Sequence, residues 1–368
     1  MTRQTTSDET RTEDSGLDEA AVQEFAGQLF DTYTKGMLTL MIDLADRTGL
    51  LEALASGRGT SRQLAERGGL DERYVRECLG ALVTGGIVEY DPAANAYELP
   101  AERAVCLTGE GSLNMAPFSR FTTLLAKTLP QVARAFRDGG GVPYDAFRPE
   151  FTDVMDGASR GFFDGQLVDG LLPLAGDLPA RLTAGARVAD IGCGSGHSTN
   201  LLARAFPQST FVGYDTNADG LARARTEAAA YGLSNVTFEN LDVATLPAEP
   251  PLDAVFAFDA IHDQVDPAAV LDHVFAALKP GGVFAMFDIR ASSRLERNIG
   301  NPMAPLLYAT STLHCLTVSL ASGGAGLGAM WGEELALNML ATAGFVDVEV
   351  HEVPDDPLDS LYVARRPA

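Results

Sequence analysis

An acidic residue and three alternating glycines follow a short apolar run at positions 188–197, which read Val-Ala-Asp-Ile-Gly-Cys-Gly-Ser-Gly-His. The acid is Asp190, and the glycines are Gly192, Gly194 and Gly196. A strand, a tight turn and the start of a helix give this order, because glycine adopts positive φ and lets a ligand reach bare backbone. The segment therefore predicts a loop that binds a nucleotide-type cofactor.

The spacing of the glycines distinguishes this loop from a dinucleotide site. A dinucleotide-binding loop has glycines at its first, third and sixth positions, with the pyrophosphate on the N-terminus of the next helix. Here the glycines occupy the first, third and fifth positions, and His197 occupies the sixth. This pattern favours a cofactor without phosphate, such as S-adenosylmethionine (SAM), whose amino-acid end Asp190 and the loop amides can hold. An NAD site and a purely structural glycine turn are the alternatives.

Two more acids stand where later strands are expected to end. Asp215 follows the strand expected at 210–214, and Asp242 with Val243 follows the strand expected at 236–240. An acid at the first of these places can accept hydrogen bonds from both ribose hydroxyls. At the second place, the carboxylate can hold an adenine amino group while the valine packs on the ring. Three acids at three successive strand ends strengthen the cofactor interpretation.

The fourth expected strand, 253–259, runs through Phe258 and leads to His262 and Asp263. Ligands of open α/β sheets bind at the carboxyl ends of the strands, where the strand order reverses, so we expect His262 near the reacting group. An imidazole titrates near neutrality and suits the removal of a proton, and Asp263 can orient it. The alternative for His262 is a helix cap. His314 is a second candidate base, with a packing role as its alternative.

Metal-ligand spacing is absent from the cysteines and histidines, and we expect no bound metal. A Mg²⁺ site is the alternative, because Asp259, Asp263 and Asp288 stand at suitable strand ends. The four cysteines are scattered, which predicts free thiols in a reducing cytoplasm. His197 is expected to be a helix residue without a partner.

Alternating strands and helices from residue 186 onward predict an α/β domain with a doubly wound, mostly parallel, seven-stranded sheet. The expected strands are 187–191, 210–214, 236–240, 253–259, 282–288, 346–352 and 360–364, and the expected helices are 198–206, 218–231, 267–278 and 331–343.

The N-terminal part predicts an α-helical winged-helix domain. One or two helices at 18–46 precede a helix begun by Thr60 and Ser61, a helix at 71–84, and two short strands at 87–90 and 96–99. A winged helix can bind DNA. Residues 50–100, however, contain five Arg, no Lys and eight acids, so we expect a dimerisation module and no nucleic-acid partner.

The middle of the chain predicts a helical linker or cap. A helix from Pro117 to Arg137 precedes glycines 139–141 and the aromatic residues Tyr144, Phe147 and Phe162, which either cover the cofactor or pack between domains. The expected organisation is a disordered tail at 1–17, a helical and winged-helix domain at 18–105, a linker or cap at 106–180, and a cofactor-binding domain at 181–368.

Composition narrows the possible partners. The net charge is −23 over 368 residues, and such an acidic surface repels nucleic acid and anionic lipid. No apolar run of about 18 residues is present, and the polar N-terminus lacks the apolar core of a secretion signal, so we expect no membrane partner and a cytoplasmic location.

Segment 186–290 resembles the class I SAM-dependent methyltransferases. The glycine loop, Asp215, the Asp242-Val243 pair and the Leu-Lys-Pro-Gly-Gly turn at 278–282 match that family's pattern. With its winged helix, the chain is similar to the bacterial small-molecule methyltransferases of this architecture. The resemblance implies transfer of a methyl group from SAM to an O, N or C nucleophile of a small organic molecule, release of S-adenosylhomocysteine (SAH), and a homodimer.

The resemblance also implies a set of site residues. The methionine end would be held by Asp190, Gly192, Cys193 and Gly194, the ribose by Asp215, and the adenine by Asp242 and Val243, with Thr216 and Phe258 completing the cofactor-binding set; the catalytic candidates are His262, His314 and Asp263. Two alternatives are a SAM-responsive winged-helix transcriptional regulator and a SAM-binding enzyme of the same fold that does not methylate.

Overall fold

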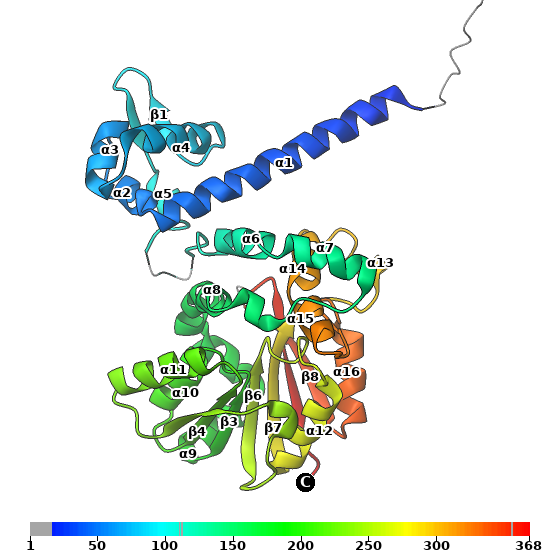
Figure 1. Ribbon diagram of the computed structural model, residues 1–368. Helices are drawn as coiled ribbons and strands as arrows, with labels where there is room; N and C mark the ends of the chain where they lie inside the picture. Colours follow the sequence, from blue (N-terminus) through cyan, green and yellow to red (C-terminus); the bar gives the residue numbers. More distant parts are fainter. Residues whose placement is uncertain (1–16, 110, 112, 355) are drawn as a thin grey trace, which may run out of the picture. The chain divides into compact units, whose positions relative to one another are not determined.

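The computed structural model describes residues 17–109, 111, 113–354 and 356–368. The tail expected at 1–17 lies outside the described residues, apart from Leu17. The chain divides into two compact units, one ending at Pro100 and the other running from Ala101 to Ala368 (Figure 1).

The first unit contains the predicted winged helix. Its elements are α1 (Glu19–Arg47), α2 (Leu50–Ala55), α3 (Ser61–Gly68), α4 (Glu72–Thr84), β1 (Glu89–Asp91) and β2 (Ala96–Glu98). Thr60 begins α3 through a capping box: its hydroxyl accepts from the amide of Gln63, and its own amide donates to the Gln63 side chain at 2.8 Å. Asp71 caps α4 through its carboxylate, which accepts from the amides of Arg73 and Tyr74. Residues 19–47 form a single helix.

Short helices open the second unit. They are α5 (Ala101–Ala104), α6 (Phe118–Ala126), α7 (Leu129–Asp138), η1 (Tyr144–Phe147), α8 (Glu150–Gln166), η2 (Leu167–Leu171), η3 (Leu172–Ala175) and α9 (Leu178–Ala184). The single helix expected from Pro117 to Arg137 is wrong, because the chain breaks between α6 and α7. Pro130 explains the break: it lacks an amide proton and so cannot continue the hydrogen bonding of α6, whereas the first turn of α7 tolerates it.

The predicted seven-stranded sheet is confirmed. Its strands are β3 (Arg187–Ile191), β4 (Thr210–Asp215), β5 (Val236–Asn240), β6 (Leu252–Phe258), β7 (Leu278–Ile289), β8 (Val346–Glu352) and β9 (Asp359–Arg365), in the order β5-β4-β3-β6-β7-β9-β8. The five adjacent strands β5, β4, β3, β6 and β7 pair in parallel, and β9 lies antiparallel between β7 and β8. The order reverses between β3 and β6, so a ligand crevice is expected beyond the carboxyl ends of these two strands.

Helices cover both faces of the sheet (Figure 1). They include α10 (His197–Ala205), α11 (Ala218–Ala230), α12 (Pro267–Ala277) and α16 (Glu333–Thr342), and a helical insertion after β7 contains α13 (Leu295–Asn298), α14 (Ala304–Leu313) and α15 (Cys315–Ala321). Consecutive residues of a strand point to opposite faces of the sheet and pack in different hydrophobic cores. Val188 of β3 and Phe256 of β6 pack with α9 and α10, whereas their neighbours Ala189 and Val255 pack with α12 and α16. Among the described residues, no helix has both the length and the apolar character needed to cross a membrane.

Candidate active site

The glycine loop joins β3 to α10 and is attached to the neighbouring strand. The amides of Gly192 and Cys193 both donate to the carbonyl of Tyr214, at 2.8 and 3.0 Å. Gly192 has a φ of +70°, and a Cβ there would lie 2.5 Å from the Cβ of Ala260, just after β6. Gly194 also has positive φ, but a Cβ there would meet no atom within 4 Å. The loop therefore packs closely against the fourth strand while leaving open space for a ligand at Gly194.

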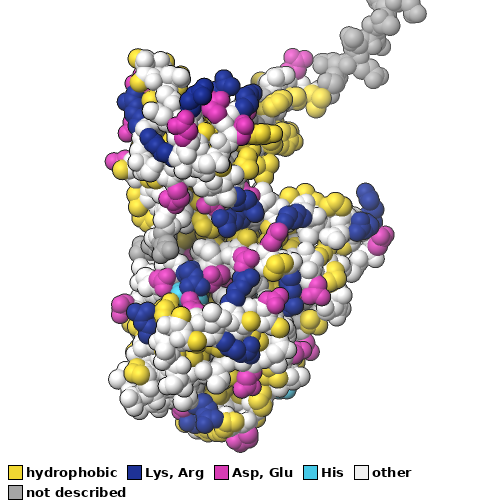
Figure 2. All heavy atoms as spheres, turned by 60° about the vertical axis from the view of Figure 1, so that its left-hand side comes forward, with side chains coloured by type: hydrophobic (Ala, Val, Ile, Leu, Met, Phe, Trp, Pro, Cys, Tyr) yellow, Lys and Arg dark blue, Asp and Glu magenta, His cyan; other side chains and the backbone are white. Residues whose placement is uncertain are grey.

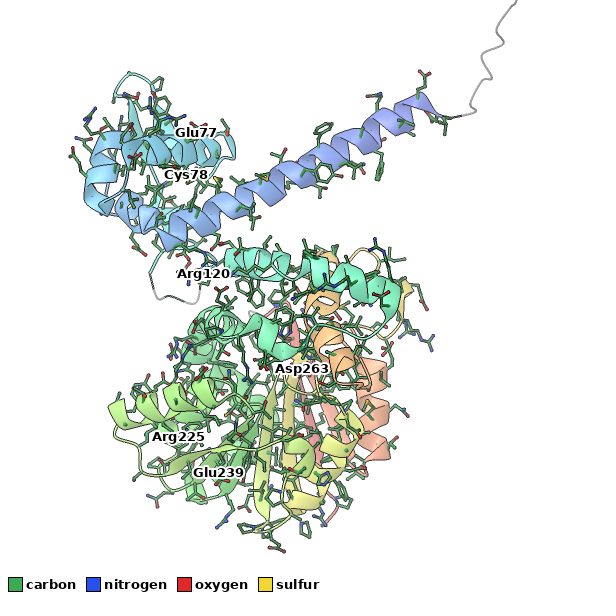
Figure 3. All side chains as sticks on the ribbon, in the orientation of Figure 1. Glu77, Cys78, Arg120, Arg225, Glu239 and Asp263 are labelled. Carbon is green, nitrogen blue, oxygen red and sulfur yellow. The ribbon has the colours of Figure 1, made fainter. Side chains whose placement is uncertain are left out.

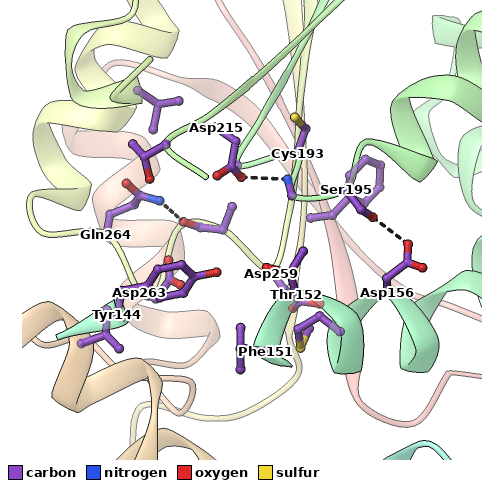
Figure 4. A pocket seen from close by; sticks show the side chains of 18 of the residues that line it. Tyr144, Phe151, Thr152, Asp156, Cys193, Ser195, Asp215, Asp259, Asp263 and Gln264 are labelled. Atoms are coloured by element: carbon purple, nitrogen blue, oxygen red, sulfur yellow. Dashed lines mark hydrogen bonds between the residues drawn. The ribbon is translucent and has the colours of Figure 1, made fainter. Parts of the chain in front are cut away.

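Asp215 lies beside this open space, at the end of β4. One of its carboxylate oxygens accepts from the amide of Gly194 at 2.7 Å (Figure 4). The other accepts from the amide of Asn217, also at 2.7 Å. Burial raises the pKa of Asp215, and these backbone hydrogen bonds oppose that rise. Asn217 in turn caps α11. The carboxylate is thereby fixed at the rim of the glycine loop.

A cavity of about 400 Å³ lies at the carboxyl ends of the strands. Eight of the predicted cofactor-binding residues line it: Gly192, Cys193, Gly194, Asp215, Thr216, Asp242, Val243 and Phe258. Asp242 also accepts a hydrogen bond from the amide of Ala244 at 3.0 Å, which fixes the turn that follows β5. The sequence thus brings together residues from the ends of four neighbouring strands in one cavity.

Asp190 does not line this cavity. Its side chain is 1% exposed, and one oxygen accepts from the hydroxyls of Ser198 at 3.0 Å and Thr199 at 2.6 Å. Burial raises the pKa of Asp190 to about 7, although the two hydroxyl donors oppose the rise. In this structure the acid fixes the first turn of α10 rather than facing the cavity.

The cap closes the cavity with aromatic and polar side chains. Tyr144, Phe151 and Phe163 line the cavity, whereas the expected Phe147 and Phe162 do not. Burial raises the pKa of Tyr144 to about 12, so its hydroxyl stays protonated at neutral pH. The hydroxyl of Thr152 accepts from the side-chain amide of Asn217 at 2.7 Å and thereby joins α8 to the cofactor loop region.

His197 has several partners, and the expectation that it has none is wrong. Its Nδ1 lies 2.8 Å from Arg160 and 2.9 Å from Glu227, and its Nε2 lies 3.1 Å from Asp164. Burial opposes ionisation of Glu227, but the hydrogen bonds from His197 and Arg160 lower its pKa to about 2. This cluster connects α8 of the cap with α10 and α11.

The same cluster reaches the cofactor loop. Arg160 donates two hydrogen bonds to Asp156, at 2.9 and 3.0 Å, and Asp156 accepts from the hydroxyl of Ser195 at 2.6 Å (Figure 4). Sequence reasoning missed Asp156, Ser195 and Arg160 as site residues. Only the i,i+4 spacing of Asp156 and Arg160 could have indicated a pair.

The three candidate catalytic residues have different environments. Asp263 lines the cavity, at the end of the sheet nearest the cap (Figure 3). Its pKa is raised to about 6, by burial above all, while His262 opposes the rise. His262 and His314 do not line the cavity. Of the three, Asp263 is the one that a cavity ligand can contact directly.

His262 points to a buried carboxylate. Its side chain is 4% exposed, and its Nδ1 lies 2.8 Å from Asp288, which also accepts from the indole nitrogen of Trp331 at 3.1 Å. Burial opposes the charged form, but Asp288 raises the pKa of His262. Asp259 stands close by, and burial together with Asp288 raises its pKa to about 7.

His314 is enclosed by aromatic rings. Its ring stacks on that of Phe151 with centroids 3.6 Å apart, and Tyr144 and Phe147 meet it edge-on. Burial lowers the pKa of His314 to about 3, so the imidazole is neutral. A neutral imidazole of such low basicity serves the packing of the cap better than the removal of a proton.

Comparison with known families agrees with this geometry. Residues 182–343 match the family model described as a methyltransferase domain, and residues 36–109 match the Rv2258c-like winged HTH domain. A trans-aconitate 2-methyltransferase of Methylobacterium nodulans is 42% identical over 114 residues, which cover 30% of this chain and 42% of that protein. The chain thus matches less than half the length of this relative.

Solved structures share the fold of residues 182–343 and of the part that precedes them. Mitomycin 7-O-methyltransferase matches with a TM-score of 0.70 at 20% identity, covering 95% of this chain and 100% of that one. Human N-acetylserotonin methyltransferase, solved with SAM, matches with a TM-score of 0.65 at 17% identity, covering 96% and 99%.

The buried carboxyl of Asp190 predicts a pH-dependent stability. Its folded-state pKa of about 7 lies above the unfolded value of about 3.9, so ionisation destabilises the fold increasingly from about pH 4 to 7 and fully above that. Asp190→Asn removes this effect. We expect the melting temperature of the variant, relative to the natural protein, to be higher at about pH 8 than at about pH 5, and the corresponding difference in the free energy of unfolding to be roughly 3 kcal/mol.

Differential scanning fluorimetry without ligand measures this difference. The matched control is Asp272→Asn on an exposed position of α12, which should show no such trend. A relative melting temperature of Asp190→Asn that stays constant or falls with pH contradicts the assignment.

Proposed function

We propose that this protein transfers a methyl group from SAM to a nucleophilic atom of a small organic molecule. The observation that carries the proposal is the carboxylate of Asp215, which accepts a hydrogen bond from the Gly194 amide at the rim of the cavity. Beside it, no atom lies within 4 Å of the position that a Cβ of Gly194 would take, so a ligand can reach the backbone there. A ribose offers two hydroxyl donors to such a carboxylate, and a cofactor without phosphate suits a loop that lacks the dinucleotide spacing. Asp242 and Val243 would hold the adenine.

Methyl transfer demands alignment more than acid catalysis. Bound SAM supplies a methyl group on a positively charged sulfur, and the departing thioether needs no proton. The protein has to hold the acceptor in line and, for many acceptors, remove one proton. Gly192, Cys193 and Gly194 would hold the methionine end through their backbone, and Asp190 would support it indirectly by fixing the start of α10.

Asp263 is our proposed general base or acceptor contact, because it lines the cavity next to residues of the fourth strand end. His262 lies behind the cavity wall on Asp288, and His314 lies within the aromatic packing of the cap. We therefore assign the two histidines to the support of the acceptor end.

The charge of the cavity bears on the acceptor. Six aspartates line it, against one arginine and one histidine. The histidine, His197, already pairs with Glu227, and the arginine, Arg148, lies 3.5 Å from Asp145. A tricarboxylate such as trans-aconitate would meet a repulsive field here. We propose a neutral or positively charged acceptor, with Phe151, Phe163 and Phe258 contacting its apolar part.

Formation of SAH from SAM across a panel of neutral phenols, alcohols and amines tests the proposal. We expect turnover with at least one of these classes and about 100-fold less or none with trans-aconitate, because charge repulsion of a few kcal/mol weakens its binding. Gly192→Ala should abolish SAH binding in calorimetry, since its Cβ would meet Ala260 at 2.5 Å. Gly281→Ala is the matched control, with a similar φ of +70° but no atom within 4 Å.

The results that contradict the proposal are specific. Absence of heat with both SAM and SAH would remove the cofactor assignment. SAM binding without consumption by any acceptor would favour the enzyme that binds SAM but catalyses another step. Preferred turnover of trans-aconitate would overturn the argument from cavity charge.

Removing the Asp263 carboxylate tests its assignment. Asp263→Asn keeps the shape but cannot accept a proton, so we expect kcat with the best acceptor to fall by about 100-fold while the SAH dissociation constant changes less than about threefold. Asp145→Asn removes an equal charge from an exposed part of the cavity wall and should leave kcat within about twofold. Equal kcat for Asp263→Asn and the natural protein would exclude Asp263 as base.

The charges on α4, the second helix of the helix-turn-helix, argue against a regulator that binds DNA. Arg73 pairs with Glu77 and Arg76 pairs with Glu72 at 3.4 Å, so acids neutralise the arginines that would approach phosphate. We propose that this domain acts in assembly, and that the protein works in a reducing cytoplasm, where its four cysteines remain free.

The exposed face of α1 supports a homodimer. Phe25, Phe30, Tyr33 and Met37 are each at least 60% exposed, and Figure 2 shows apolar side chains gathered along this helix. Contiguous exposed apolar surface of this kind marks an interaction site, and we propose that a second copy of the chain covers it.

Light scattering after size exclusion measures the assembly. We expect a dimer for the natural protein and a monomer for the double variant Phe25→Glu with Phe30→Glu, because the two charges would be buried in the interface. Glu24→Gln, on the same helix, is the control and should stay dimeric. A monomeric natural protein at about 10 µM, a concentration at which most stable dimers persist, contradicts the dimer.

A further inference from the structure

We propose that Asp259, His262 and Asp288 bind a divalent transition-metal ion beside the acceptor end of the cavity. Each of these residues offers a ligand atom, and the three atoms lie within 4.8 Å of one another. A metal with bonds of about 2.1 Å separates its ligand atoms by up to about 4.2 Å, so small side-chain rotations suffice to close the site.

The carboxylate of Asp288 has an oxygen without a partner. Its Oδ1 accepts three hydrogen bonds, from His262 at 2.8 Å, from Trp331 at 3.1 Å and from the amide of Ile289 at 2.8 Å. Its Oδ2 accepts none from the described part of the chain, although Asp288 is fully buried. Leaving a buried acceptor unsatisfied costs about 1–3 kcal/mol, and more for a charged group. Such an oxygen indicates a ligand that the protein itself does not supply.

Two neighbouring carboxylates repeat this feature. Asp259 lies just after β6 and Asp359 begins β9, and the Oδ1 of each is buried without a described partner. Three carboxylates therefore meet one imidazole beside the cavity, where Asp288 and Asp359 are buried and Asp259 is half-buried. Buried like charges repel strongly, and a divalent cation neutralises two of them at once. Asp359 would contribute its charge to the field around the ion.

The ligand types restrict the choice of ion. Imidazole nitrogen together with carboxylate oxygen suits Mn²⁺, Fe²⁺ or Zn²⁺, whereas Ca²⁺ prefers a cage of six to eight oxygens. The hydrogen bond from the indole nitrogen of Trp331 would orient Asp288, as partners outside the metal site commonly orient metal ligands. Three protein ligands leave coordination positions open for another molecule.

Asp259 also lines the cavity, so an ion bound to it would face the space for the acceptor. The glycine loop is adjacent, since Gly192 packs against Ala260, the residue after Asp259. If the proposed methyl transfer is correct, on which this role rests, the ion would bind the acceptor's oxygen or nitrogen and ease loss of its proton. The acceptor would then be a molecule with a hydroxyl or amine that can coordinate a metal.

This site differs from the one considered from the sequence. That alternative combined Asp259 and Asp288 with Asp263 and named Mg²⁺. In the structure, His262 joins the two strand-end aspartates and Asp263 is not part of the group. Asp263 therefore provides an internal control: a carboxylate in the same cavity whose loss should leave metal binding nearly unchanged.

Titration with Mn²⁺ tests the proposal directly. The full-length protein is treated with EDTA, desalted and titrated with MnCl₂, and free Mn²⁺ is followed by electron paramagnetic resonance. We expect one ion per chain with a dissociation constant below about 100 µM, displaced by Zn²⁺. Asp259→Asn and Asp288→Asn should each weaken binding at least about tenfold, and Asp263→Asn less than about threefold.

Either of two results overturns the proposal: no Mn²⁺ or Zn²⁺ bound by the natural protein at about 1 mM metal, or unchanged affinity in Asp259→Asn. Asp259 lies at the cavity wall, so its variant remains informative if Asp288→Asn fails to fold. Calorimetry with SAH on the same samples separates the two proposals. Loss of SAH binding with intact Mn²⁺ binding contradicts the methyltransferase proposal alone, and the reverse result contradicts the metal site alone.

Discussion

The parallel register of β3, β4, β5, β6 and β7 brings all their carboxyl ends to one edge of the sheet, and the rest of the site depends on this constraint. Asp215, Asp242, Asp259 and Asp288 each stand at such an end. Carboxylates gathered at one edge repel each other and are partly removed from water, so the edge favours ligands with positive charge or several hydrogen-bond donors. A sulfonium donor, its ribose hydroxyls and a metal ion all meet this condition.

The cap completes the site by attaching itself to the cofactor loop. Asp156 and Arg160 of α8 connect with Ser195 in the loop and with His197 and Glu227 on the helices behind it. An ion-pair network that spans three helices holds the cap at a fixed distance from the strand ends. Tyr144, Phe151 and Phe163 of the cap line the cavity, and exclusion of water by such rings would strengthen the electrostatic interactions inside.

Local sequence patterns were sufficient for the sheet and for bringing eight of the expected residues to the wall of one cavity. The strands β3, β4, β6 and β7 contain short apolar runs, and a glycine, an acid or an asparagine stands at or just after the end of β3, β4, β5 and β6, so the strands and the acids at their ends follow from the chain itself. The capping residues Thr60 and Asp71 likewise indicated where the helices α3 and α4 of the winged helix begin. Pro130 shows the limit of periodicity, because one imino acid divided an otherwise continuous apolar pattern.

The surroundings of the histidines depended on contacts between distant parts of the chain. His262 is oriented by Asp288, and Trp331 reaches that same carboxylate from the loop before α16. His197 is paired with residues of α8 and α11, and Asp190 is turned inward by the hydroxyls of α10. A single sequence does not predict which carboxylate, distant along the chain, an imidazole will pair with. Side-chain direction at the cavity wall was therefore the part that required the structure.

A crystal structure of the full-length protein with SAH tests the central claim most directly. The claim is that the edge formed by the parallel strand ends holds the donor. We predict that the ribose hydroxyls lie within hydrogen-bond distance of Asp215 and that the sulfur faces the space between Gly192 and Asp263. SAH bound elsewhere, or a ribose turned away from Asp215, would contradict this account.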